Sequence, residues 1–214
     1  MMKRLLPLLL LPLLSLASPA AVSPLQIGIN SPFHTGPGGD ELQLVSPETT
    51  ILGLRLNLPV AFNHNVGGLD VGLFSYATHF SGIRLNFQSW THKTVRGVDV
   101  SLISMGTEDE ESALYGIQIA GMGVVRHMRG IQAGLLTHGD VRGVQMGLWN
   151  IALDLRGLQM GLVNFIVNPE APAAGVQIGL VNFAEIPPHG IQLGLLNIAP
   201  SSVCPYLPLL RLSF

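Results

Sequence analysis

One eight-residue phrase occurs four times between Gly143 and Asn197, and it constrains the fold more than any other feature of the chain. The copies begin at Gly143, Gly157, Gly175 and Gly190, and they read GVQMGLWN, GLQMGLVN, GVQIGLVN and GIQLGLLN. Self-similarity at a fixed short period indicates that one structural unit is stacked on the next. The sequence therefore predicts a repeat protein.

Weaker copies continue the phrase toward the N-terminus, which makes ten copies in all. They begin at Gly53, Gly68, Gly82, Gly97, Gly116 and Gly130. Successive copies start 13 to 15 residues apart, except for one spacing of 19 and one of 18 residues. We interpret these two as insertions at 107–112 and 168–173, because insertions in repeat proteins lie in surface loops.

Within each copy, apolar residues alternate with polar or small ones. In the copy at Gly175 the apolar residues are Val176, Ile178 and Leu180. A period of two places them on one face of a β-strand, whereas a helix would scatter them around its axis. The alternation slips by one residue after Leu180, and because Asn is common in turns we predict a corner at Asn182.

Two all-β architectures fit such strands, and the third position of the phrase distinguishes them. A parallel β-solenoid of about ten coils would stack this position on itself at a spacing of about 4.8 Å, whereas an antiparallel, ten-stranded up-and-down barrel would not. In order, the position carries Arg55, Asp70, Arg84, Asp99, Gln118, Gln132, Gln145, Gln159, Gln177 and Gln192. Neighbouring opposite charges attract, and stacked glutamines can form an amide ladder. We therefore predict the solenoid, with these ten residues as a structural ladder.

The barrel stays open as the alternative because of the C-terminal sequence. Leu210, Leu212 and Phe214 alternate and end on an aromatic residue, which resembles the closing strand of bacterial outer-membrane barrels, and ten is an even number of strands. The apolar row would then face lipid, and the Arg, Asp and Gln row would line the lumen. Membrane strands need about 9 to 11 residues, however, which is longer than the phrase. Aromatic residues also make up only 6% of the chain.

The remaining segments complete a four-part organisation. Residues 1–21 combine Lys3 and Arg4, an apolar run and small residues, which is the pattern of a secretory signal peptide and predicts export. Residues 22–52 are rich in Pro and Gly and predict an N-terminal cap. The repeat array covers 53–199, and 200–214 predict a C-terminal capping strand.

Composition and side-chain chemistry favour neither catalysis nor nucleic-acid binding. The net charge is -2, whereas a nucleic-acid-binding domain needs a basic face. Paired acid and base groups, a G-x-S-x-G elbow and a phosphate-binding loop are missing from the sequence, so we predict neither an enzyme nor a cofactor. The single cysteine, Cys204, excludes an internal disulfide, and we predict that it is a buried small hydrophobe.

Metal binding was weighed at two places and predicted at neither. His64, His79, His92 and His127 lie ten or eleven residues after an opening glycine and would share one edge of a stack. We interpret them as solvent-exposed loop residues, because no carboxylate or cysteine accompanies them in regular register. The acidic run 108–111 lacks the spaced ligands of a calcium loop, so we interpret it as a solvated charge run.

The phrase Gly-x-Gln-x-Gly-Leu-x-Asn resembles the repeat of a family of bacterial surface-repeat proteins built from tandem GVQIGLVN-like units of about 14 residues. The resemblance covers 53–199, with departures at Ser101 and Ala120. It implies export to the cell envelope or surface, and no catalytic activity. We therefore expect an exported, non-enzymatic envelope protein with a structural or binding role. Its partner would be an envelope component, host matrix or its own copies, and outer-membrane association is a further option. The alternative function is a small outer-membrane barrel that acts as a pore or anchor.

Overall fold

The computed structural model describes residues 21–29, 44–106, 112–167, 174–185 and 188–213, and every regular element in them is a β-strand. In chain order the strands are β1 (Val22–Gly28), β2 (Thr50–Gly106), β3 (Ala113–Ile166), β4 (Ala174–Ile178), β5 (Val181–Ala184), β6 (His189–Ile198) and β7 (Tyr206–Ser213). The predicted all-β class is confirmed. In this part of the chain, no helix is long and apolar enough to cross a membrane.

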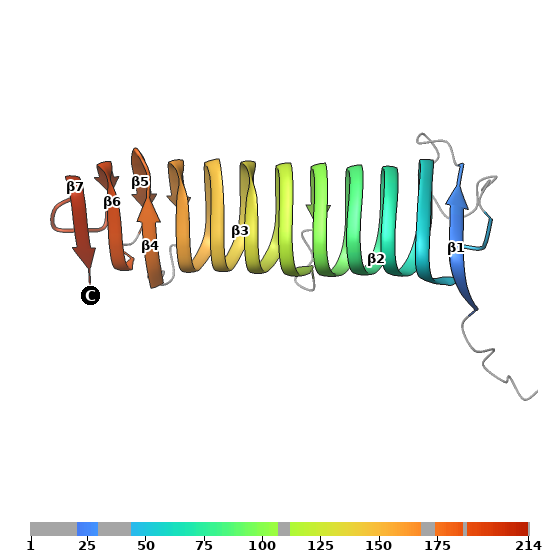
Figure 1. The fold of residues 1–214 in the computed structure, drawn as a ribbon. Helices are drawn as coiled ribbons and strands as arrows, with labels where there is room; N and C mark the ends of the chain where they lie inside the picture. The colour runs from blue at the N-terminus through green and yellow to red at the C-terminus, as the bar shows by residue number, and fades with distance from the viewer. Residues whose placement is uncertain (1–20, 30–43, 107–111, 168–173, 186–187, 214) are drawn as a thin grey trace, which may run out of the picture.

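Neighbouring strands run parallel and in register, so the chain winds as a β-solenoid (Figure 1). Where β2 meets β3, Gly97 pairs with Gly116. Strand β4 lies between β3 and β6, which places Gln177 between Gln159 and Gln192. Identical positions of the phrase are thus stacked on one another, and the predicted parallel β-solenoid is confirmed.

The alternative prediction of an antiparallel barrel is wrong. Among the strand pairings of the described residues, only the pairing of β6 with β7 is antiparallel. Parallel stacking sets each polar third-position side chain beside the same position of the next copy, where Arg55 bonds to Asp70 and the glutamines bond to one another. An antiparallel meander lacks this regular self-stacking, so the repeated phrase favours the solenoid.

The predicted number of ten coils is not supported by the pairings between separately bounded strands, which describe about five turns. Strands β2 and β3 each continue without a break through more than one turn (Figure 1). Their bounds therefore do not separate one turn from the next.

The two glycines of the phrase meet two different steric needs. Gly157 opens its copy with a φ of 144°, and a Cβ there would overlap the carbonyl oxygen of Gly143 in the preceding copy. Only glycine combines this conformation with so close an approach of two backbones. A Cβ at Gly161, the fifth residue of the same copy, would overlap the carbonyl oxygen of Gly147 and also the side-chain amide of Asn150, for which this glycine leaves room.

The corner of the phrase lies two to three residues earlier than predicted. The chain bends at Gly179 and Leu180, between β4 and β5, and Asn182 is a buried residue inside β5. The prediction of a corner at Asn182 is therefore wrong. Two successive residues, Leu180 and Val181, face outward at the bend, and this accounts for the slip in the alternation.

The interior of the solenoid has an apolar side next to its polar one. Its members come largely from the residues between the end of one phrase and the next opening glycine; Leu155, for example, is fully buried two residues before Gly157. The cluster comprises Ile51, Val66, Ala77, Phe80, Val95, Leu114, Val125, Met128, Val141, Ala152, Leu155, Ile166 and Ala184. Its burial provides the apolar part of the driving force for folding.

Both ends of the solenoid hold a buried polar side chain in line with the ladder. Gln26 of β1 pairs with Arg55, and its side-chain amide exchanges hydrogen bonds with the backbone of Val45. Arg211 of β7 lies opposite Gln192. The ladder therefore extends beyond the ten predicted positions at each end.

The turn before β7 corrects one prediction. Cys204 is exposed, so the prediction that it is a buried small hydrophobe is wrong. Its backbone carbonyl accepts a 2.7 Å hydrogen bond from Nη2 of Arg211, and the carbonyl of Pro205 accepts a second one of 3.1 Å. The turn directs its carbonyl groups inward toward Arg211 and leaves the thiol outside.

Three predictions depend on residues that lie outside the described ones. The signal peptide depends on residues 1–20, the acidic run on 108–111 and the closing aromatic residue on Phe214.

Candidate functional site

All ten predicted ladder residues lie in the interior of the solenoid and form one buried column. None of them is more than 1% exposed. Charged side chains occupy the N-terminal part of the column, and glutamines occupy the rest. A buried charge is costly unless it is paired, so the contacts of each member decide what the column does.

Arg55 and Asp70 form the best-partnered pair of the charged part. Nε of Arg55 donates to Oδ1 of Asp70 at 3.1 Å, and Nη2 donates to Oδ2 at 2.7 Å. Arg55 also donates to Oγ of Ser75 and to the carbonyl of Tyr76. Burial alone would raise the pKa of the Asp70 carboxyl, but the Arg55 charge and hydrogen bonds and the Arg84 charge outweigh it, so this pKa lies below its ordinary value.

Arg84 and Asp99 form a looser pair. Nε of Arg84 lies 4.0 Å from Oδ1 of Asp99, and neither Nε nor Nη1 of Arg84 has a hydrogen-bond partner. Nη2 donates to Oγ1 of Thr91, and the guanidinium carbon lies 4.3 Å from the centre of the Phe80 ring. Burial therefore lowers the pKa of Arg84 from its ordinary value, although the Asp99 and Asp70 charges act in the opposite direction.

The glutamines form a continuous ladder in which every amide points the same way. From Gln132 onward, each Nε2 donates to Oε1 of the glutamine in the preceding copy; the bond from Gln159 to Gln145, for example, is 2.8 Å long. The other bonds of this series join Gln132 to Gln118, Gln145 to Gln132, Gln177 to Gln159 and Gln192 to Gln177, at 2.6 to 3.0 Å. The side chains thus provide a second set of hydrogen bonds between turns, alongside the backbone.

A second ladder runs beside the first and in the opposite direction. Nδ2 of Asn150 donates to Oδ1 of Asn164, Nδ2 of Asn164 donates to Oδ1 of Asn182, and Nδ2 of Asn182 donates to Oδ1 of Asn197. Here each earlier copy donates to the later one. Amide dipoles in the two ladders therefore oppose one another, so their aligned dipoles partly cancel.

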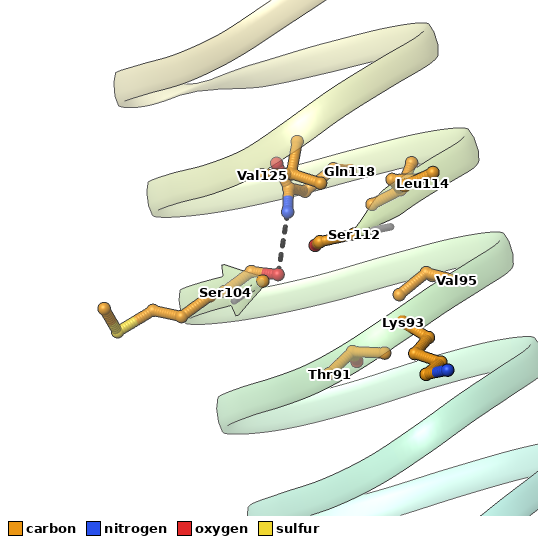
Figure 2. A pocket seen from close by; sticks show the side chains of 11 residues that line it. Thr91, Lys93, Val95, Ser104, Ser112, Leu114, Gln118 and Val125 are labelled. Carbon is orange, nitrogen blue, oxygen red and sulfur yellow. Dashed lines mark hydrogen bonds between the residues drawn. The ribbon is translucent and has the colours of Figure 1, made fainter. Parts of the chain in front are cut away.

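A small cavity lies in the described part of the interior, beside the ladder. The cavity in Figure 2 lies between Val95, Ser104, Ser112, Leu114 and Gln118 and measures about 10 Å³. That volume is at the lower limit for a single water molecule. Because the ladder side chains are enclosed, the outer surface is the candidate site.

The outer surface begins with a row of aliphatic side chains at the second and fourth positions of each phrase, which we call the first apolar face. None of these residues is buried. They are Leu54, Leu56, Leu69, Val71, Ile83, Leu85, Val98, Val100, Ile117, Ile119, Ile131, Ala133, Val144, Met146, Leu158, Met160, Val176, Ile178, Ile191 and Leu193. Strand β7 continues the face, because Leu210 and Leu212 lie opposite Leu193 and Ile191.

A second apolar face follows the bend of the phrase, beyond a corner row of exposed residues. The corner row consists of Leu58, Leu73, Phe87, Leu102, Leu135, Leu148, Leu162, Leu180 and Leu195. The second apolar face consists of Phe62, Phe74, Tyr76, Trp90, Ile103, Met105, Met122, Val124, Leu136, Trp149, Ile151, Val163, Phe165, Val181, Phe183, Leu196 and Ile198, none of which is buried. Gln88 and His138 interrupt it. Its aromatic rings stack in columns; the centroids of Phe62 and Tyr76, for instance, are 4.8 Å apart.

The remaining side of the solenoid is polar, and we call it the polar face. It contains His64, His79, His92, Lys93, Arg96, Arg126, His127, Arg129, Asp140, Arg142, Asp154 and Arg156, all at least partly exposed. The solenoid is thus amphipathic around its circumference. Two adjoining faces are apolar and one is charged.

The histidines have carboxylate neighbours that the sequence did not reveal. Nε2 of His64 lies 3.4 Å from Oε1 of Glu48, and Nδ1 of His127 lies 3.0 Å from Oδ2 of Asp140. Asp140 stands ten residues after the opening Gly130, so the statement that no carboxylate shares the histidine edge in regular register is wrong. Within the described ranges, no group of three or more His, Cys, Asp or Glu side chains is placed to hold a metal ion.

No protein-family model, curated protein or solved structure matches this chain. The geometry of the outer surface must therefore carry the functional argument.

The ladder was predictable from the sequence, but the outer faces were not. Alternation separates two sets of side chains without indicating which set lies inside. One signal could have identified the inner set. A polar position that repeats with complementary charges or amides in every copy can satisfy its own hydrogen bonds when buried, whereas an aliphatic row has no such requirement.

Proposed function

We propose that this chain is an exported, non-enzymatic protein of the cell envelope or surface, and that its two apolar faces form its binding surface. The observation that carries the proposal is the outward orientation of the second and fourth positions, which are aliphatic in every copy. A typical monomer exposes no apolar patch larger than about 300 to 600 Å². A patch that follows the whole array therefore calls for an apolar partner.

Export is supported by two features of the sequence. Residues 1–21 have the three-part pattern of a secretory signal peptide, and the phrase resembles that of bacterial surface-repeat proteins. Charged residues make up only 11% of the chain, compared with about 25% in ordinary soluble domains. Such a composition suits a protein that works against an apolar surface.

A non-enzymatic role is supported by the position of the polar side chains. The Arg, Asp and Gln residues of the ladder are enclosed, and most of their polar atoms are bonded to other turns. Groups engaged in this way hold turns together and do not meet a substrate. The predicted pore loses its basis, since these side chains fill the interior.

We also infer that each copy of the phrase forms one coil, which would make ten coils in 53–199. The support is steric. From Gly68 onward, each opening glycine lies against the opening glycine of the preceding copy, and Gly190 lies against Gly175 in this way. Gly53 lies instead against Pro24 of β1.

Partitioning into a detergent-rich phase tests the apolar binding surface. The protein without residues 1–21 should enter the detergent phase. A variant with Ile117→Gln, Ile119→Gln and Ile131→Gln on the first apolar face should move toward the aqueous phase. The matched control carries His64→Gln, His79→Gln and His92→Gln on the polar face, and it should partition like the wild type. Circular dichroism verifies that all three proteins keep their strand content. Retention of the wild type in the aqueous phase would contradict the proposal.

A further inference from the structure

A row of arginines borders the first apolar face. Arg96, Arg129, Arg142 and Arg156 each stand immediately before an opening glycine, and all four are exposed. The residue after that glycine belongs to the first apolar face, as Ile131 does after Arg129 and Gly130. Each arginine therefore stands two residues before a member of the first apolar face.

The spacing of this row brings like charges together. Gly130, Gly143 and Gly157 lie against one another in successive copies, so the arginines that precede them are separated by about 4.8 Å along the axis at the backbone. Like charges at neighbouring positions repel one another. An anion beside the row would relieve this repulsion.

Among the described residues, the carboxylates of the polar face are fewer than its cations. Among the described residues of 94–156, the polar face has five arginines, Arg96, Arg126, Arg129, Arg142 and Arg156, and two carboxylates, Asp140 and Asp154. Oδ2 of Asp154 lies 3.4 Å from Nε of Arg156, whereas Asp140 lies against His127. Within the described residues, neither Arg129 nor Arg142 has a carboxylate partner.

Two further contacts keep the row at the surface. The guanidinium carbons of Arg96 and Arg129 lie 5.8 and 5.4 Å from the centre of the Tyr115 ring, which occupies the same position in the copy between them. Arg129 and Arg142 also line one hollow of the polar face, together with His127, Asp140 and Asp154. Planar guanidinium groups side by side are well suited to phosphate oxygens, which they bind in a bidentate manner.

The shape of the apolar surface favours a fluid partner. The two apolar faces meet along the corner row, so a rigid partner with one flat face would cover only one of them. Acyl chains can cover both faces and the corner between them. Backbone groups must be bonded internally in an apolar medium, and the parallel pairing of successive turns fulfils this condition along the solenoid.

We propose that the protein lies in the interface of a lipid layer with anionic, phosphate-bearing headgroups, with its apolar faces among the acyl chains and the arginine row at the level of the phosphates. This proposal rests on the apolar binding surface of the proposed function and names its partner. Interfacial proteins bury their apolar face about 5–10 Å deep, and basic side chains beside it add electrostatic attraction to anionic lipid. The polar face then remains in water.

Co-sedimentation with vesicles tests the proposal on the protein without residues 1–21. The probes are vesicles of phosphatidylcholine alone and vesicles of phosphatidylcholine mixed with phosphatidylglycerol. We expect binding to both, and tighter binding to the anionic vesicles. A triple variant, Arg129→Gln, Arg142→Gln and Arg156→Gln, should lose roughly 100-fold in affinity for the anionic vesicles at low salt and keep its affinity for the neutral ones. The matched variant with Lys at the same three positions keeps the positive charges and should retain the preference for anionic vesicles. It shows whether replacement of the three arginines by itself disturbs the fold.

The outcomes separate this inference from the proposed function. Equal binding of the wild type to both kinds of vesicle, or no effect of the Gln variant on anionic vesicles, overturns the anionic-lipid proposal and leaves the apolar surface in place. Loss of neutral-vesicle binding in the Ile117, Ile119 and Ile131 variant supports that surface separately. A wild type that binds no vesicles and elutes as a dimer overturns the lipid proposal in favour of a second copy of the chain.

Discussion

Gln118 donates a 2.7 Å hydrogen bond from Nε2 to Oγ of Ser104, and this contact joins the charged and the amide parts of the buried column (Figure 2). Ser104 gives its single proton to Oδ2 of Asp99 at 2.7 Å. It can therefore only accept from Gln118, which must turn its NH₂ group toward Asp99. Each later glutamine repeats this orientation, so the negative charge of Asp99 sets the direction of the whole ladder.

The far end of the ladder is consistent with this polarity. The last acceptor, Oε1 of Gln192, has no hydrogen-bond partner, and the residue opposite Gln192 is the buried cation Arg211. A positive charge near the acceptor end and a negative charge at the donor end both stabilise the aligned amide dipoles. The two buried charges thus complement the ladder that lies between them.

Replacement of Ser104 by Ala should destabilise the fold by about 1–3 kcal/mol, because it leaves a buried amide donor and a carboxylate oxygen without their partner. Urea unfolding followed by circular dichroism measures the loss. Ser23→Ala is the matched control. Ser23 is only partly buried and bonds its near neighbour Leu25, so its replacement should change the free energy of unfolding by less than about 0.5 kcal/mol. Equal losses in the two variants would contradict the linking role of Ser104.

The two buried arginines should differ in what they contribute. Arg55→Met should cost about 3–5 kcal/mol, because it strips a well-bonded carboxylate of its partner. Arg84→Met should cost clearly less, since two nitrogens of Arg84 are already unpartnered and Asp99 keeps its bonds to Ser101 and Ser104. The measurement is the midpoint and slope of urea unfolding for each variant. A larger loss for Arg84→Met would show that the 4.0 Å separation understates its coupling to Asp99.

Asp70 should make the stability of the protein depend on acid. Its pKa is lowered in the folded state, so the unfolded chain binds the proton more readily. The stabilisation is therefore present above the ordinary pKa of 3.8 and is lost as the pH falls through the lowered value. Urea unfolding between pH 6 and about pH 2 should show this loss in the wild type. The slope of stability against pH should be smaller in Asp70→Asn, whereas Asp154→Asn on the surface should keep the wild-type slope.

The ladder was predictable from the sequence because it depends on a single position that repeats along the chain. Arg and Asp alternate at the third position of the phrase, and Gln repeats there in later copies. This pattern is explained if the third positions of successive copies lie side by side, as Asp99 and Gln118 do. The inside of the coil was not predictable in the same way. The apolar and polar rows of a strand are equivalent as a pattern, and hydrophobicity alone would bury Val176 and Ile178 instead of Gln177.

The ends and the corner were missed for a different reason. Gln26 and Arg211 stand outside any copy of the phrase, so no periodicity marks them as members of the buried column. Asn182 has the composition of a turn residue, but its amide finds better partners in the neighbouring turns than it would at the surface. Tertiary hydrogen bonds therefore outweigh the local turn preference at this position.

The opening glycines should be the positions least tolerant of a side chain. Gly157→Ala forces a Cβ into the carbonyl of Gly143 at a φ of 144°, so it should cost more than about 3 kcal/mol, the upper range for backbone strain alone. Gly67→Ala is the matched control, because its Cβ would meet only the flexible end of the Leu52 side chain, which can move aside. Thermal unfolding by circular dichroism should show a large drop in the midpoint for the first variant and a small change for the second. If Gly157→Ala unfolds like the wild type, successive turns do not approach each other at their opening glycines, and the inference of one coil for each phrase fails with it.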